Sequence, residues 1–260
     1  MLKVKLLALL LPVCLIAGGC GAKTEPVADT STNVATAPED TANEAAPPVV
    51  EPTKTYTLSD PASTGLPPEA VEALKKEALP PPPASMPTPK EATLLFTTSK
   101  GTIKVQLNGK EAPLEVKSFV YLTQKGFYNS TIFHRYADLM EGSGNGQKGR
   151  IIQGGDPLTK NPKLKQFWGA GGPGYEVPRE HNNLTHEAFV IAAARSSDPD
   201  SAGSQFYFTV DPVPFLDQGD GYTVFGKVLS GKDVVSKLRA GDKLEKVEVL
   251  SETKSSAKPK

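Results

Sequence analysis

The sequence predicts a mostly β fold, a closed eight-stranded antiparallel β-barrel capped by two α-helices. Eight short runs between residues 92 and 250 are rich in β-branched and aromatic residues and are separated by turn residues. Two further stretches, near either end of this region, carry helix signals instead. Many short strands with few helices are typical of a barrel, in which closure removes the exposed strand edges.

The elements follow one another in a simple order. Residues 92–98 and 101–107 alternate apolar and polar side chains across Ser99 and Lys100, which indicates a hairpin. A helix is predicted over residues 113–126, because Pro113 stands at its start, Gly126 at its end and apolar residues recur at helical spacing. The second helix is predicted over 231–241. The remaining strands are expected in "TIFHR", "RIIQ", "FVIAAA", "QFYFTV", "TVFGKVL" and "KVEVL".

Residues 1–19 resemble a bacterial lipoprotein signal peptide. Two lysines precede an apolar run that ends in Ala17-Gly18-Gly19-Cys20, where a peptidase would cut before a lipid-modified Cys20. The run is shorter than the roughly 20 residues that a membrane-spanning helix needs. Cys14 and Cys20 are the 2 cysteines of the sequence, so the exported part has no disulfide to form. An ordinary cleaved signal peptide remains the alternative.

Residues 20–90 are expected to form an extended, disordered tether. Fourteen of the 24 prolines fall between residues 21 and 90, together with 10 acidic and 5 basic side chains, a net charge of −5. Within it, residues 67–79 have apolar residues at helical spacing and could form one short helix. The folded domain is expected over 91–251, followed by a disordered basic tail over 252–260.

Composition excludes some classes of function. With 29 basic and 29 acidic side chains the chain has no net charge, so a nucleic-acid-binding surface is not expected. The three histidines lack metal-ligand spacing, and we expect no metal and no cofactor. The glycines show no phosphate-binding pattern.

Several phrases, in a fixed order, resemble the cyclophilins. They are "GFYNSTIFHR" (126–135), "IIQGGDP" (151–157), "GGPGYEVPRE" (171–180), "ARSSDPDSAGSQFYF" (194–208) and "FLDQGDGYTVFGKVLSGKDVV" (215–235). The resemblance covers the whole predicted domain and implies an eight-stranded barrel that acts as a peptidyl-prolyl cis-trans isomerase. Its substrates would be proline-containing, unfolded or exported polypeptides, and it would work as a monomer.

Arg135 is the candidate catalytic residue. Rotation about a peptide bond removes amide resonance, against a barrier of roughly 18–20 kcal/mol. The electron pair then localises on the prolyl nitrogen, which becomes a hydrogen-bond acceptor. A guanidinium is always charged and has several N–H groups in a rigid fork, so it can donate to that nitrogen in the twisted state. A surface salt bridge is the alternative role for such an arginine.

The resemblance also implies the substrate-binding residues. Ile151, Tyr207 and Leu216 would line a slot for the proline ring, with Phe215 and Tyr222 at its rim. Gln153 and Gln205 would bind the substrate backbone or hold Arg135. Ala194, Arg195 and Ser196 would flank the residue before the proline. Phe206 is expected in the core, because strand neighbours face opposite ways.

The chain departs from the family in six places, one of which is Ile151, where a methionine is usual. Residues 136–149 are an insertion, interpreted as a mobile flap or, with slight preference, a peripheral elaboration. A second insertion, residues 158–168, contains Trp168 and could cap the barrel. Arg150 stands where a phenylalanine usually lines the slot. Phe215 replaces the usual tryptophan, which implies weaker cyclosporin binding, and Tyr222 replaces a histidine.

Two functions therefore stay open. The first is an active isomerase attached by Cys20 to a membrane of the bacterial cell envelope. The second is a catalytically weak or inactive proline-binding module or scaffold with the same tether. A polar Arg150 inside the slot would favour the second.

Overall fold

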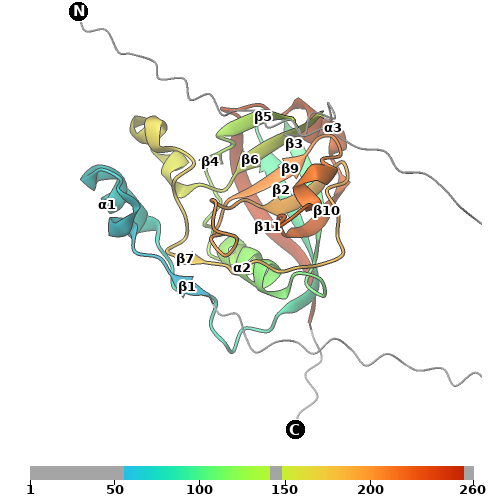
Figure 1. Ribbon diagram of the computed structural model, residues 1–260, viewed down its shortest axis with the longest axis horizontal. Helices are drawn as coiled ribbons and strands as arrows, with labels where there is room; N and C mark the ends of the chain where they lie inside the picture. Colours follow the sequence, from blue (N-terminus) through green and yellow to red (C-terminus); the bar gives the residue numbers. More distant parts are fainter. Residues whose placement is uncertain (1–55, 141–147, 255–260) are drawn as a thin grey trace, which may run out of the picture. The chain divides into compact units, whose positions relative to one another are not determined.

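One antiparallel sheet dominates the structure, a computed structural model that describes residues 56–140 and 148–254. In these residues nine strands form the sheet, in the order β4-β11-β2-β3-β10-β8-β9-β6-β5 (Figure 1). Its strands are β2 Pro89–Thr98, β3 Gly101–Asn108, β4 Thr131–Ile132, β5 Arg135–Met140, β6 Lys148–Gly154, β8 Val190–Ala193, β9 Phe206–Thr209, β10 Val224–Ser230 and β11 Lys243–Lys254. The prediction of a mostly β fold is therefore confirmed.

Two of the three α-helices in the described part of the chain are those predicted for the domain. Helix α2 (Pro113–Gln124) starts at the predicted proline, whose missing N–H costs nothing in a first helical turn. It packs on β2, β3 and β11 and buries Phe119 and Val120. Helix α3 (Lys232–Lys237) lies in the predicted segment and is shorter than expected. The predicted hairpin is also present, because Thr98 of β2 pairs with Gly101 of β3 across a two-residue turn.

The predicted closure of the barrel is wrong. In the described residues no strand pairing joins the two outer strands, β4 and β5, so the sheet is curled and open. Both outer strands come from one stretch of chain, with Thr131–Ile132 paired to β11 and Arg135 paired into β6. Between them, Phe133 turns a fully buried ring towards Phe206, with ring centroids 6.2 Å apart. The gap between β4 and β5 is therefore crossed by the covalent chain and not by a ladder of hydrogen bonds between strands.

Aromatic rings fill the inside of the curled sheet. The rings of Phe119 and Tyr128 stack with centroids 4.6 Å apart, and Phe206 meets Phe119 edge-on at 5.4 Å. Phe206 is fully buried, as predicted, and packs also against Phe96 from β2. Edge-to-face contacts of this kind add to the stabilisation from burial. The core thus joins α2 to strands from both halves of the domain.

The chain is folded from Tyr56 onward, well before the expected domain start at residue 91. Strand β1 (Thr57–Leu58) pairs with β7 (Tyr175–Glu176), and η1 (Pro61–Thr64) leads into α1 (Pro68–Glu77). Helix α1 matches the short helix expected within residues 67–79. Apolar spacing on α1 places Ala70 and Leu74 against the 158–168 insertion, so residues 56–90 are not an extended tether. At the other end, β11 continues to Lys254, into the expected tail.

The insertion at 158–168 forms two 3₁₀ helices, η2 (Pro157–Lys160) and η3 (Pro162–Phe167). Helix η2 packs on α1, and η3 packs on η2 (Figure 1). Asp156 precedes η2 and accepts a hydrogen bond from the backbone N–H of Leu158 at 2.7 Å. Buried side chains join the two segments in a small apolar cluster, here called the satellite cluster. Its buried members are Ala70, Leu74, Leu158 and Leu164, and its half-buried members are Leu66, Ala73, Phe167 and Trp168.

Two carboxyl groups lie at the start of α2. Glu180 accepts hydrogen bonds from the backbone N–H groups of Leu114 and Glu115, both at 2.8 Å, and so caps the helix. Burial raises the pKa of Glu180 to about 7. The Glu115 side chain is 3% exposed, and burial and the neighbouring Glu180 carboxylate raise its pKa well above the usual range. The folded protein therefore favours the protonated forms.

We expect the protein to lose thermal stability as the pH rises from 5.5 to 8. Both pKa values are raised on folding, so the stabilisation is complete below the unfolded pKa of about 4.5 and is lost as the pH passes through about 7. Melting temperatures measured at both pH values check this. Glu115→Gln removes one titrating group and should shrink the difference, whereas Glu69→Gln on the exposed face of α1 should leave it unchanged. A melting temperature that rises with pH would contradict the expectation.

Candidate active site

A cavity of about 450 Å³ lies beside the β5–β6 hairpin and is called the slot below. Most of the predicted site residues line it. They are Arg135, Ile151, Gln153, Ala194, Arg195, Tyr207, Leu216 and Tyr222. Residues from four separate parts of the sequence thus meet at one place, as the motif order predicts.

Arg135 begins β5, directly opposite Gln153 of β6 in the strand pairing. Its guanidinium is exposed at the slot, and Nη1 donates a hydrogen bond to Gln153 Oε1 at 3.0 Å. The strand pairing fixes where the side chain starts and the glutamine fixes where it points. A cation is therefore held at the slot with N–H groups left over for another acceptor.

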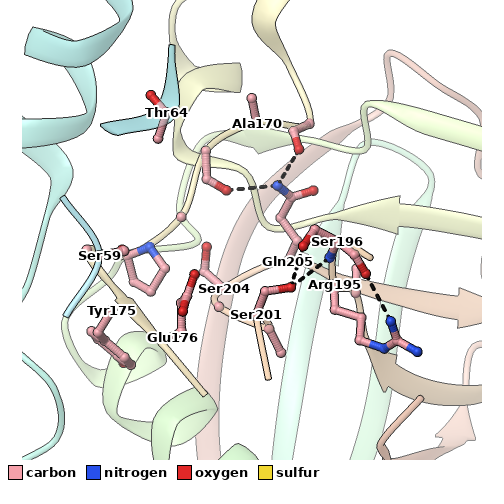
Figure 2. A pocket seen from close by; sticks show the side chains of 18 of the residues that line it. Ser59, Thr64, Ala170, Tyr175, Glu176, Arg195, Ser196, Ser201, Ser204 and Gln205 are labelled. Carbon is pink, nitrogen blue, oxygen red and sulfur yellow. Dashed lines mark hydrogen bonds between the residues drawn. The ribbon is translucent and has the colours of Figure 1, made fainter. Parts of the chain in front are cut away.

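Gln153 and Gln205 continue this arrangement as a chain of hydrogen bonds. Gln153 Nε2 donates to Gln205 Oε1 at 2.9 Å, and Gln205 Nε2 donates to the carbonyl oxygens of Gly169 and Gly171, both at 2.8 Å (Figure 2). Of the two roles predicted for the glutamines, the structure shows the one in which they hold Arg135. Gln205 also ties Arg135 to the glycine-rich segment 169–174, here called the strap.

Apolar side chains make the floor of the slot. Ile151 and Tyr207, from neighbouring strands β6 and β9, are each 3% exposed and pack with Leu216 and Tyr222 in one cluster. Leu216 is carried by η4 (Pro214–Asp217). Phe215 packs against the same cluster but does not line the slot, so its predicted position at the rim is not found. The cavity is large enough for a pyrrolidine ring and is apolar where that ring would lie.

Arg150 does not enter the slot. Its guanidinium makes a two-pronged ion pair with Asp211, Nε to Oδ2 at 2.5 Å and Nη2 to Oδ1 at 2.7 Å. That contact holds the pKa of Asp211 below its usual value. Because strand neighbours face opposite ways, Arg150 lies away from the slot when Ile151 faces it. The expected polar obstruction is therefore absent, and the position assigned to Arg150 in the slot is wrong.

The insertion at 136–149 supplies the missing apolar wall. Rather than an irregular loop, its described parts extend β5 and β6 as a hairpin, paired from Arg135↔Gln153 to Met140↔Lys148. Residues 141–147 lie outside the described part. Leu139 on this hairpin lines the slot. The preferred interpretation, a peripheral elaboration, does not account for this contact.

Arg195 lies over the Tyr222 ring, 4.4 Å from guanidinium carbon to ring centroid. Its Nε and Nη2 donate to the Gly221 carbonyl at 3.2 and 2.9 Å, which fixes the ring at the slot edge. Ser196 lines a second hollow of about 310 Å³ instead, which borders the strap (Figure 2). Gln205 and Ala194 also border this hollow, so it continues the slot past the strap.

Sequence reasoning missed three residues that border the slot. His134, next to Arg135, lines it in a neutral state, because burial and the adjacent cation lower its pKa to about 4. Trp168 and Gly169 line the same side. The sequence marks Trp168 only as the single tryptophan within an insertion, and no local pattern ties it to the slot. The expectation of no metal and no cofactor stays a prediction.

His186 lies beneath the slot and joins two of its walls. Its Nε2 and the Tyr207 hydroxyl are 2.7 Å apart, and its Nδ1 contacts the Asp217 carboxylate on η4. An ionised carboxylate only accepts, so Nδ1 carries the proton and Nε2 accepts from the Tyr207 hydroxyl. The hydroxyl is thereby turned away from the slot. Burial lowers the pKa of His186, which keeps the ring neutral.

The curled antiparallel sheet thus carries a hollow with an apolar floor and a few fixed polar groups, the usual composition of a ligand-binding pocket. The chain belongs to the cyclophilin family: the sequence model described as "Cyclophilin type peptidyl-prolyl cis-trans isomerase/CLD" matches residues 93–255.

Three similar proteins carry the name peptidyl-prolyl cis-trans isomerase. Peptidyl-prolyl cis-trans isomerase A of Dickeya dadantii is 37% identical over 148 residues, which cover 56% of this chain and 70% of that protein. The isomerase of Synechococcus elongatus is 34% identical over 160 residues, 61% of this chain and 96% of that one. An isomerase of Arabidopsis thaliana is 35% identical over 59% of this chain, which spans only 27% of that longer relative.

Solved structures of cyclophilins are also similar. A Cryptosporidium parvum cyclophilin type isomerase aligns with 24% identity and a TM-score of 0.49, covering 62% of this chain and 98% of that one. A second structure of that protein was determined in the presence of the dipeptide Ala-Pro, with a TM-score of 0.47.

Replacing His186 by alanine should lower the free energy of unfolding by about 1–3 kcal/mol, because the buried Tyr207 hydroxyl loses its acceptor. Urea denaturation measures this. In a Tyr207→Phe background the hydroxyl is already absent, so the same replacement should cost less. Equal losses in both backgrounds would show that the hydrogen bond contributes nothing.

Proposed function

We propose that the protein is an active peptidyl-prolyl cis-trans isomerase in which Arg135 stabilises the twisted amide. The substrate proline would sit on Ile151, Tyr207 and Leu216, with its nitrogen facing the guanidinium. Rotation localises an electron pair on that nitrogen, and the free N–H groups of Arg135 donate to it. Because a planar amide nitrogen accepts poorly, the interaction is stronger midway through rotation than before it.

One observation carries this proposal: Arg135 is held by Gln153 at the mouth of a slot of about 450 Å³ that has an apolar floor. Rotation about the bond moves no proton and needs no nucleophile. A fixed cation and a hollow that accepts the proline ring are therefore sufficient for catalysis of this rotation. The scaffold alternative drew its support from a polar Arg150 in the slot and from the inserted flap, and the ion pair with Asp211 removes the first of these.

The substrates we propose are exported proteins with exposed Xaa-Pro bonds, met at the surface of a membrane. The support is the sequence of residues 1–20, in which an apolar run ends in small residues and Cys20. This segment lies outside the described residues. Within residues 56–140 and 148–254, no helix has the length and apolar character to cross a membrane.

Arg135→Ala should reduce catalysis about a hundredfold to a thousandfold, the usual loss when one donor to a developing charge is removed. Exchange spectroscopy on a short Xaa-Pro peptide measures the rate. Arg135→Lys should restore little, because a lysine lacks the planar fork that Gln153 orients. Arg150→Ala is the matched control and should stay close to wild type. Peptide binding without faster exchange in the wild type would favour the scaffold.

Cys20→Ala should abolish lipid attachment. Cells that express the full chain with labelled palmitate should label the wild type and not the variant, and the variant should move from the membrane to the soluble fraction. Labelling that survives the substitution would exclude Cys20 as the attachment site.

A further inference from the structure

Trp168 is the one tryptophan of the sequence, and it lies at the edge of the slot with Gly169 and His134. Its Nε1 donates to the carbonyl oxygens of Leu158 at 3.1 Å and Asn161 at 3.4 Å. The polar end of the ring is therefore already bonded. What the half-buried ring still offers to the slot is apolar carbon surface.

The satellite cluster supports this ring from behind. Leu158 is 1% exposed and Leu164 4% exposed, and both pack with Ala70 and Leu74 of α1. A tryptophan that rests on a packed apolar base can bind a partner without first being ordered, so little entropy is lost. The N-terminal helix, which precedes the domain recognised from the sequence, thus contributes to the slot wall.

The backbone after Trp168 is fixed from the catalytic side as well. The Gly169 N–H donates to the Asp156 carboxylate, and the Gly169 carbonyl accepts from Gln205 at 2.8 Å. Asp156 is fully buried. Through Gln205 and Gln153, the position of Trp168 is linked to that of Arg135.

Beyond Gly169 the groove continues along the strap into the second hollow (Figure 2). The N-terminal segment closes this hollow from outside, since Ser59 N–H donates to the Gly174 carbonyl at 3.1 Å and Leu79 N–H to the Pro173 carbonyl at 2.8 Å. Gly169 borders both hollows. An extended peptide that runs from one to the other must therefore pass the Trp168–Gly169 corner.

We propose that Trp168 is a specificity-determining residue that receives an apolar side chain next to the substrate proline. The proposal rests on the isomerase function proposed above and narrows its substrates to Xaa-Pro sequences flanked by large apolar residues. An aromatic side chain fits best, because it can stack on the exposed part of the indole.

The test compares peptides that differ only in having alanine or phenylalanine beside the proline, before or after it. Wild type should prefer one phenylalanine peptide over its alanine counterpart in kcat/KM, and Trp168→Leu should reduce that preference about tenfold, mainly through KM. Trp168→Phe should restore most of it. Leu250→Ala, at a site 51% exposed on β11, is the control and should keep the preference. An unchanged preference in Trp168→Leu would overturn the proposal.

A binding measurement separates this proposal from the catalytic one. Because Trp168 is the one tryptophan, its emission reports directly on the slot wall. Titrating Arg135→Ala with the preferred peptide should shift the emission with a similar half-saturation concentration as in wild type, even though catalysis is lost. If wild type shows no catalysis and the shift is present, only the isomerase function fails. If saturating peptide leaves the emission unchanged, the role of Trp168 fails.

Discussion

The site depends on holding a guanidinium in one direction without consuming its hydrogen-bond donors. A free arginine side chain would lose conformational entropy each time it met a substrate, and a salt bridge would occupy the N–H groups that the proposed mechanism needs. The neutral side-chain amide of Gln153 avoids both costs, because it orients the guanidinium with a single hydrogen bond. Gln153 accepts one bond from Arg135 and is itself fixed by Gln205, which ends on two backbone carbonyls of the strap. The direction of one cation is thus determined by contacts between residues 18 to 52 positions apart in the sequence.

Strand alternation decides what the slot is made of. On β6, Ile151 and Gln153 face the slot, so Ile152 faces the main core and Arg150 lies on the side where Asp211 can pair with it. The extended β5–β6 hairpin then brings Leu139 to the slot. The hairpin therefore provides an apolar wall, and the arginine is accommodated outside the slot by its ion pair with Asp211.

The sequence was sufficient for the fold family and for the residues whose chemistry is carried by local motifs. Arg135 after "IFH", Gln153 before two glycines and Tyr207 after "SQF" were all predicted and all reach the slot. The prediction that the barrel closes was wrong, because closure depends on how two strand edges meet in space. The position predicted for Arg150 was wrong because its partner, Asp211, is 61 residues away in the chain. His186 was missed because the residues that it contacts, Tyr207 and Asp217, are 21 and 31 residues away. None of these contacts leaves a periodic signal.

The satellite cluster gives the domain a second, smaller cooperative unit. It buries four side chains, against an aromatic-rich core that ties the whole sheet together. Units with few buried contacts open at a lower free energy than the global transition, and amide hydrogen exchange detects them as separate foldons. Helix α1 and η2–η3 are therefore expected to exchange earlier than β2, β3 and β11. Such an opening would remove one side of the groove while the sheet and Arg135 stay in place. Under the roles proposed here, the breadth of substrates accepted and the rate of rotation would then be set by parts of the molecule with different stabilities.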